Sequence, residues 1–306
     1  MTGRYITPEE RVKPVPVYFD TNVFGDLTDV GNPDTSEWLR ALRIGISEHR
    51  VRIILSFENL QELLIGPEHK SNDLQRCREL CREIADWLYL LKPAHELFED
   101  DILSFARTGG PSIPFVRPGH ELWEYIDPIR FGQRDLLRSL QSKDCLSRTM
   151  NFERGFVNSV LKRANPDRAK SVRSNIKRHQ SNPESQWKAL WDDGATAEIM
   201  ARDFADRLNV LPECEERGLD QLLRVPTVRM TLGYTLHAWY MQIIQQKTSF
   251  QPSDAMDSRH ATCAGAVGNI VTTDRRFRAA IEHVPDHGVR VRSLNELVSE
   301  LQGTVS

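Results

Sequence analysis

Two acidic residues stand at equivalent ends of apolar segments that are predicted as strands, and two more lie on the neighbouring helices. Asp20 closes the run VPVYFD, and Asp274 follows the run IVTT. Glu62 lies on the helix predicted after the second strand, and Asp257 lies near the start of the helix predicted before IVTT. In an open parallel sheet, functional groups gather beyond the carboxyl ends of the strands. We therefore expect these four side chains to converge, although they are far apart in the sequence.

A group of three or four carboxylates is poorly stable without a cation, because like charges raise one another's pKa. Ligands that are all oxygen atoms suit a hard divalent ion, Mg²⁺ or Mn²⁺. Such an ion can polarise a phosphoryl oxygen and lower the pKa of a bound water. The chemistry that this pattern predicts is hydrolysis of a phosphodiester bond.

Each acid also has an ordinary structural explanation. Asp20 could belong to a turn, Asp257 could interact with a helix dipole, and Asp274 could be a helix N-cap. Glu62 could simply lie on the surface. Two of the acids follow strongly apolar segments at equivalent ends, and this joint placement favours the metal site over four separate coincidences.

Two further acids compete with members of this set. Glu58 lies one turn before Glu62 and could share its helix face. Asp254 lies three positions before Asp257 and could be an auxiliary ligand. The spacing to the neighbouring residues favours Glu62 and Asp257 as the principal acids.

Several polar neighbours could support the acids. Asn22 and Thr272 could hold the acids at the two strand ends by hydrogen bonds, as outer-shell partners of metal ligands do. His260 could approach the scissile phosphate or be a packed helix histidine. Arg275 could contact a phosphate or lie on a helix surface.

The elements that must position these residues alternate at both ends of the chain. Strands are predicted at 15–20, 51–56, 270–273 and 288–293. Helices are predicted at 35–49, 57–66, 72–91, 253–266 and 294–302, with another beginning near Asp274. This alternation predicts an α/β fold with one parallel, doubly wound sheet.

The middle of the chain has a different pattern. It has few strand-like runs, and helices are predicted at 121–141, 153–163, 184–209 and 227–246. We therefore expect a large all-helical insertion, 92–250, between an N-terminal half of the α/β domain, 14–91, and a C-terminal half, 251–306.

Charge is concentrated in one part of that middle segment. The chain has 40 basic and 43 acidic residues, but residues 143–180 hold ten Lys or Arg against three acids. Such a basic island could hold a phosphate backbone or be a solvated helical face. Phe152, Phe156 and Trp187 could stack on unpaired bases or form a core. The cations singled out for nucleic-acid contact are Lys162, Arg163, Lys177 and Arg178.

Composition excludes several classes of protein. With 40% hydrophobic and 27% charged residues, a packed core is expected. No stretch approaches the roughly 20 apolar residues of a membrane span, and the first residues have no signal-peptide core. Five widely spaced cysteines favour a reducing compartment, so a cytoplasmic location is expected. The sequence has no phosphate-binding Gly-rich loop and no acyl-transfer nucleophile elbow.

The arrangement resembles the PIN-domain nucleases. The matching segments are VYFDTNVF (17–24), SFENLQEL (56–63) and DSRHATCAGAVGNIVTTDRRF (257–277). A phosphatase of the haloacid-dehalogenase type also begins with a strand ending in Asp. It needs a second Asp where this chain has Asn22, which cannot transfer a proton at neutral pH.

The resemblance implies a three-layer PIN-like domain with a mostly parallel central sheet, interrupted here by the helical insertion. It implies an endoribonuclease that depends on Mg²⁺ or Mn²⁺, with Asp20, Glu62, Asp257 and Asp274 as metal ligands. RNA is the expected partner, whereas a homodimer and a protein regulator are left open. The alternative is a catalytically silent PIN-like module that binds RNA or a protein through the insertion. Cleavage of DNA is a third interpretation.

Overall fold

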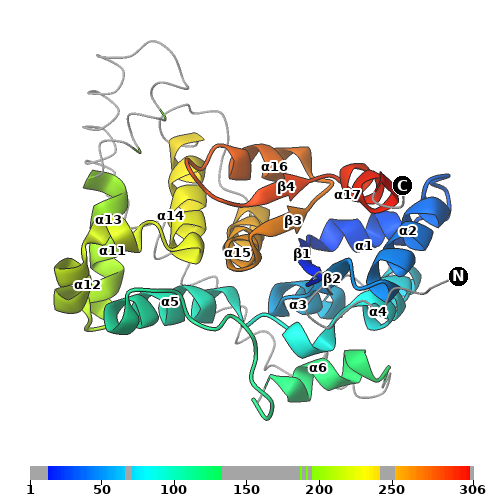
Figure 1. Cartoon of the computed structure of the whole chain (residues 1–306), viewed down its shortest axis with the longest axis horizontal. Helices are drawn as coiled ribbons and strands as arrows, with labels where there is room; N and C mark the ends of the chain where they lie inside the picture. Colours follow the sequence, from blue (N-terminus) through cyan, green and yellow to red (C-terminus); the bar gives the residue numbers. More distant parts are fainter. Residues whose placement is uncertain are drawn as a thin grey trace, which may run out of the picture.

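A parallel four-stranded sheet lies at the centre of the α/β part of the molecule, with strand order β2-β1-β3-β4 (Figure 1). The structure is a computed structural model that describes residues 13–65, 71–120, 122–132, 187, 191, 195–241 and 252–303. The strands are β1 (Val15–Phe19), β2 (Val51–Ile54), β3 (Asn269–Val271) and β4 (Arg290–Arg292). The four predicted strands and their parallel pairing are confirmed.

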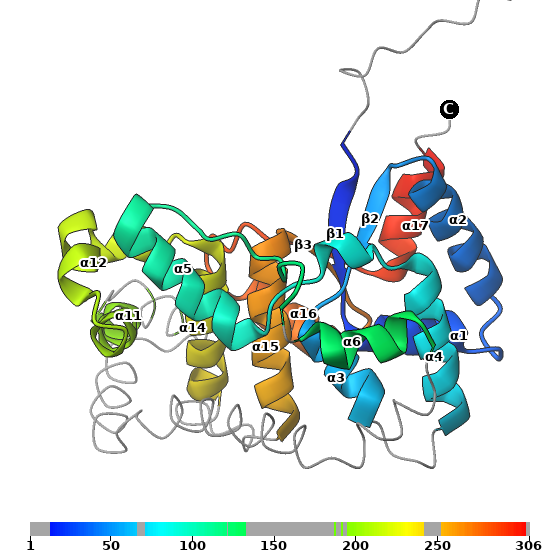
Figure 2. The same cartoon turned by 90° about the horizontal axis from the view of Figure 1, so that it is seen from below.

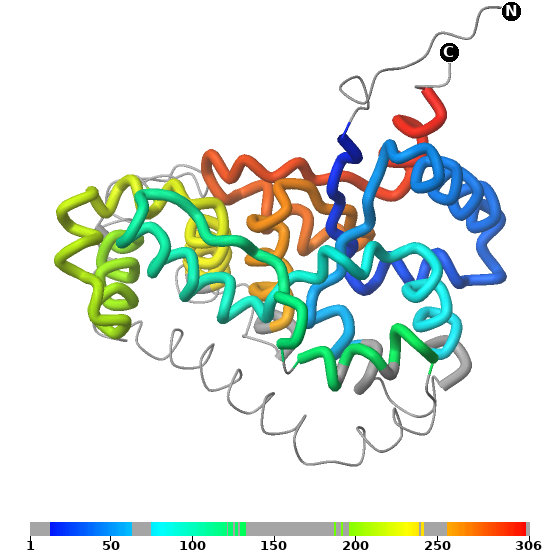
Figure 3. Tube along the Cα trace, turned by 60° about the horizontal axis from the view of Figure 1, so that its bottom comes forward, coloured from blue at the N-terminus to red at the C-terminus, as the bar shows by residue number. Residues whose placement is uncertain are grey.

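The two ends of the chain meet in the middle of this sheet. In β1, Tyr18 pairs with Ile270 of β3, and on the other side the same strand pairs with β2. Figure 3 traces the blue first strand between blue and orange segments. The chain therefore winds in one direction from β1 to β2 and in the other from β3 to β4, which makes the gap between β1 and β3 the topological switch point.

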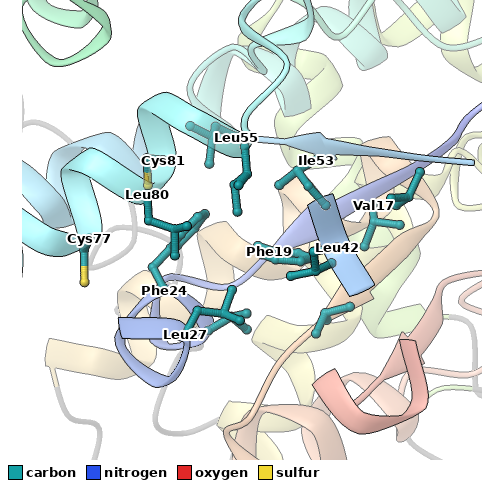
Figure 4. Close-up of a cluster of buried hydrophobic side chains, with 14 of the residues drawn as sticks. Val17, Phe19, Phe24, Leu27, Leu42, Ile53, Leu55, Cys77, Leu80 and Cys81 are labelled. Carbon is teal, nitrogen blue, oxygen red and sulfur yellow. The ribbon is translucent and has the colours of Figure 1, made fainter. Parts of the chain in front are cut away.

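One face of the sheet is covered by helices from both ends of the sequence. Val17 and Phe19 point to this face, as the two-residue period of a strand requires, and pack there with Leu42 and Leu301. Figure 4 shows part of this cluster, in which Phe19 lies close to Leu42. The covering helices are α1 (Thr21–Thr28), α2 (Thr35–Ser47), α4 (Ser71–Ile84) and α17 (Leu294–Gly303).

The opposite face packs against a second set of helices. Tyr18, Ile54 and Ile270 point to this side and share one apolar cluster with Met230 and Phe277. The elements here are the start of α5 (Ala94–Thr108), α14 (Pro226–Trp239), α15 (Pro252–Val267) and α16 (Arg275–Glu282). Helices on both faces of a parallel sheet are compatible with a three-layer α/β fold.

Five described helices of the middle segment share a third apolar cluster at the far end of the molecule (Figure 2). They are α5, α14, α11 (Ala195–Arg207), α12 (Leu211–Arg217) and α13 (Leu219–Leu222). The helix α6 (Trp123–Arg130) is not part of it, because Ile126 packs in the cluster of Val17 and Phe19. Leu97 of α5 and Met230 of α14 pack in the cluster of Tyr18 and Ile270, so these two helices also cover the sheet. Trp187 is 4% exposed, so it is a core residue and not a stacking platform.

Four basic residues of the window 143–180 that are expected to contact nucleic acid, and two aromatic residues of the same window, lie outside the described residues. They are Phe152, Phe156, Lys162, Arg163, Lys177 and Arg178.

The helix predicted at 72–91 is shorter in the structure. It ends at Ile84, and the chain then runs beside β2 through a single 3₁₀ turn, η3 (Trp87–Tyr89). The amide of Asp86 donates to the carbonyl of Ile53, and that of Leu91 to Leu55. Hydrogen bonds to the open edge of β2 thus replace the helical ones, a tertiary effect that helical periodicity cannot report. Helices α1 and α5 were not among the predicted elements.

The cysteines and the hydropathy of the helices can be compared with the expectations from composition for the described residues. Four cysteines (Cys77, Cys81, Cys214 and Cys263) are buried and free of disulfide bonds. None of the described helices is both long enough and apolar enough to cross a membrane.

Candidate functional site

Asp20 lies at the switch point of the sheet, directly after β1 and at the start of α1. Its amide donates to the carbonyl of Val271 in β3 at 3.0 Å. Its carboxylate Oδ2 accepts a hydrogen bond from the Thr272 hydroxyl at 2.9 Å and a longer one from the Asn22 amide at 3.4 Å. Only 4% of the residue is exposed. A carboxylate is thus held in place where open α/β sheets bind ligands.

The environment of Asp20 disfavours its charged form. Burial raises the pKa of this carboxyl, and the nearby charge of Glu62 raises it further. The charge of His260 and the hydrogen bond from Thr272 act in the opposite direction without cancelling the effect of burial. A cation bound at this carboxylate would therefore relieve an unfavourable negative charge.

Glu62 and His260 form the other half of the site. Glu62 lies on α3 (Phe57–Ile65), and its Oε2 is 3.1 Å from Nε2 of His260 on α15. The other ring nitrogen, Nδ1, is hydrogen-bonded to the Tyr18 hydroxyl from β1, which is 3.0 Å from Ser56 Oγ. A continuous hydrogen-bonded chain thus runs from the interior to the half-buried carboxylate.

The charges of this pair support each other. Burial alone would lower the pKa of His260, but the hydrogen bond and charge of Glu62, together with the charges of Asp20 and Glu58, raise it to about 9. Burial alone would raise the pKa of Glu62, but the hydrogen bond and charge of His260 bring it below its ordinary value. His260 is 2% exposed, so it supports the acid and is not placed to touch a phosphate.

Asp274 is the N-cap of α16. Its Oδ1 accepts hydrogen bonds from the amides of Arg276 at 2.7 Å and Phe277 at 3.0 Å. Its own amide donates to the Thr272 hydroxyl at 3.1 Å, and that hydroxyl donates to Asp20. The capping explanation is therefore correct for one oxygen, and Asp274 is joined to Asp20 through a single side chain.

Asp257 lies beyond the first turn of α15, because this helix begins at Pro252. Its Oδ2 accepts a hydrogen bond from the Tyr234 hydroxyl of α14 at 3.3 Å. It is one helical turn before His260 and so lies on the same side of α15 as the Glu62 contact. The side chain of Asp254 lies outside the described residues.

Glu58, the competitor of Glu62, has another role. It is fully buried, and its Oε1 accepts a hydrogen bond from the amide of Ala94 at the start of α5 at 2.7 Å. Its Oε2 is 3.3 Å from the thiol of Cys263, which donates to it. Both carboxylate oxygens of Glu58 are thus engaged in holding the first turn of α5 and Cys263 of α15 against α3.

Sequence reasoning missed three polar residues that shape the site. The Asn59 amide donates to the Phe19 carbonyl at 2.9 Å and to the Thr21 hydroxyl at 3.0 Å, which ties α3 to the end of β1. Arg259 is buried, and its charge helps to lower the pKa of Glu62. Tyr18 anchors His260. The only sequence signal for Asn59 was its position inside the segment SFENLQEL.

The donor set fits a hard divalent cation, although the side chains are not arranged as a finished metal site. Among the described residues, no three His, Cys, Asp or Glu side chains lie close enough to hold a metal ion. Asp20 is a buried carboxylate with a raised pKa, and the charge of Glu62 acts on it. Asp274 is joined to Asp20 through the Thr272 hydroxyl, whereas Asp257 is hydrogen-bonded to Tyr234. Oxygen donors of this kind suit Mg²⁺ or Mn²⁺.

No protein-family model, curated protein or solved structure matches the chain. What the fold and the site define is an α/β protein with a parallel sheet and acidic residues at the carboxyl edge of its central strands.

Proposed function

We propose that this protein is a PIN-like, metal-dependent endoribonuclease that hydrolyses RNA phosphodiester bonds at the carboxyl edge of β1 and β3. The observation that carries the proposal is the buried carboxylate of Asp20 at the switch point, joined through Thr272 to the acid after the neighbouring strand. Glu62, on a third element, is close enough for its charge to raise the pKa of Asp20.

Asp20, Glu62, Asp257 and Asp274 would hold Mg²⁺ or Mn²⁺, which activates water and stabilises charge on a phosphate. The remaining residues orient this set. Thr272 and Asn22 direct the carboxylate of Asp20 by hydrogen bonds. His260 holds Glu62 and partly offsets the repulsion among the acids, a supporting role typical of residues behind metal ligands.

RNA is the proposed substrate because of the resemblance to PIN-domain nucleases, which rests on the order and spacing of the four acidic motifs. The supporting observation is that the matching segments lie on the adjacent parallel strands β1 and β3 and on helices next to them. Arg275 is exposed beside Asp274 and supplies positive charge next to the acids. The basic window 143–180 would add more.

The test is cleavage of single-stranded RNA with Mn²⁺ or Mg²⁺ by the wild type and by Asp20→Asn. Removing the charge of Asp20 should lower the cleavage rate at least about a hundredfold, since metal-based stabilisation contributes several kcal/mol. A matched control is Asp101→Asn, because Asp101 is also 4% exposed and hydrogen-bonded, to Thr227 and the amide of Ser112. Asp101 lies on α5 and is not one of the proposed metal ligands, so the cleavage rate of this variant should stay near that of the wild type.

Absence of cleavage by the folded wild type, across several RNAs and both metals, would contradict the enzyme proposal. Retained RNA binding in that case would favour the catalytically silent module. The same assay with single-stranded DNA distinguishes the two sugars.

A further inference from the structure

A small cavity borders the acidic site, outside the carboxyl end of β3. Its volume is about 240 Å³, and the residues around it include Trp38, Thr272, Asp274, Arg275, Arg278 and Asn295. Thr272 and Asp274 also belong to the acidic site, where Thr272 bonds Asp20. A molecule in the cavity would therefore lie next to the proposed point of cleavage.

One wall of the cavity is an aromatic ring with a fixed orientation. Trp38 on α2 donates from its indole Nε1 to Oδ1 of Asn295 on α17 at 2.8 Å. Most of the indole is packed into the apolar cluster of Val17 and Phe19, so its position does not depend on a ligand. Leu294 lines the same cavity. Trp38 is 9% exposed, so together with Leu294 it offers a small, rigid apolar edge, which loses little entropy when a base lies against it.

The two arginines of the cavity differ in their ion pairs. Arg278 is held by Glu282 at 2.9 Å and by Glu296 at 3.0 Å. Arg275 is exposed, and within the described part of the chain it forms no ion pair. Arg275 is therefore the cation that can accept an incoming anion without losing an existing partner. A guanidinium group suits phosphate because it can donate two parallel hydrogen bonds.

We propose that this cavity binds one nucleotide of a single-stranded RNA, directly beside the phosphodiester bond that the acidic site cleaves; the proposal rests on the nuclease function above. Sites that enclose a whole drug-sized ligand measure roughly 300–1,000 Å³. This cavity is smaller, so it can hold only a part of a larger ligand. One nucleotide of a longer strand needs only part of such a volume. The apolar edge lies where the base can pack, and a guanidinium group for the phosphate is a contact by which proteins hold single strands.

The first experiment measures binding separately from cleavage. A fluorescein-labelled single-stranded RNA is titrated into the Asp20→Asn protein, alone and combined with Arg275→Ala or Arg276→Ala. Arg276 is the matched control, since it is also exposed on α16 but does not line the cavity. Removing Arg275 should weaken binding about tenfold, the size expected for a charged hydrogen bond. The Arg276 variant should change it less than about twofold, as for exposed charges. Equal effects of the two substitutions would overturn the proposal.

The second experiment reads the cavity directly. Uridine monophosphate should quench tryptophan emission of the Asp20→Asn protein, and Trp38→Phe, checked for fold by circular dichroism, should remove that change. No quench, or an equal quench by inorganic phosphate, would contradict a nucleotide site.

The two proposals can fail independently. If the wild type cleaves RNA in an Asp20-dependent manner but the Arg275 substitution weakens binding no more than the Arg276 substitution, only the cavity proposal fails. If Arg275-dependent binding is found without any cleavage, the nuclease proposal fails and the binding site stands.

Discussion

At the scale of single residues, His260 has the most unusual environment in the site. It is buried between a neutral phenol, Tyr18, and a half-buried carboxylate, Glu62. Burial opposes a charge on the ring, but the surrounding acids outweigh it and raise the pKa to about 9. The folded protein therefore holds a proton on His260 that the unfolded chain, with an ordinary value of 6.5, has lost at alkaline pH.

This proton makes stability dependent on pH in a definite direction. Because the folded pKa is above the unfolded one, the stabilisation is complete below about pH 6.5 and is lost as the pH rises through about 9. Urea unfolding in metal-free buffer should show the free energy of unfolding decreasing across this window, by at most about 1.4 kcal/mol per pH unit for one group. His260→Gln should be less stable at neutral pH and should lack this decrease. A wild-type value that is constant from pH 6.5 to 9 would contradict the assignment.

At the scale of elements, α15 connects the acidic site with the helical part. It carries His260, which contacts Glu62, and Asp257, which accepts a hydrogen bond from Tyr234 of α14. Further along, it packs closely against α14. Gly265 permits this close approach, since a Cβ there would lie 2.7 Å from the Pro226 carbonyl oxygen and 3.0 Å from Met230 Cγ. The backbone oxygen cannot move aside as a flexible side chain can, so the distance between the two helices depends on this glycine.

The substitution Gly265→Ala should therefore lower the free energy of unfolding by about 1–3 kcal/mol, the usual effect of overpacking a core. The matched control is Gly25→Ala in α1, where nothing lies within 4 Å of the added Cβ. There the greater helix propensity of alanine should be neutral or stabilise by up to about 1 kcal/mol. Chemical denaturation of both variants measures the difference, and equal values would argue against the tight contact between α14 and α15.

At the scale of the whole molecule, an aromatic cluster joins the helical part to the sheet domain. His237 of α14 stacks on His283, which follows α16, with their ring centroids 4.9 Å apart. Trp187 packs edge-on against His237, and its indole donates to the His283 carbonyl at 2.7 Å. Burial, aided by the charge of His283, lowers the pKa of His237 to about 4. The aromatic cluster of Trp187, His237 and His283 therefore contains a neutral imidazole at His237.

Acid should lower the stability that this aromatic cluster provides. The unfolded chain binds a proton on His237 near pH 6.5, whereas the folded one does so only near pH 4, so stability is full above pH 6.5 and declines as the pH falls through this window. His237→Phe keeps an aromatic ring against Trp187 and removes the proton. The variant should lose less stability than the wild type between pH 6.5 and 4, as measured by tryptophan fluorescence during urea unfolding. Identical acid dependence of the two proteins would refute this role.

Much of the fold could be predicted because its signals are local. The four strands are short apolar runs, and the alternation of helix and strand at both ends of the chain indicated a parallel sheet before any contact was known. Asp20 and Asp274 were placed correctly at strand ends for the same reason. The end of α4 at Ile84 could not be predicted, since it depends on hydrogen bonds to the distant edge of β2.

The sequence by itself determined which residues form the strands, which acids follow them, and that the two ends of the chain build one sheet, because these properties follow from residue type and spacing. Only the tertiary structure decided where each side chain points. It directed Glu58 to the start of α5 and Glu62 to His260, one turn apart on the same helix. It also buried His260 between Tyr18 and Glu62. Such choices depend on which distant groups lie across each helix face, and no local pattern in the chain encodes that.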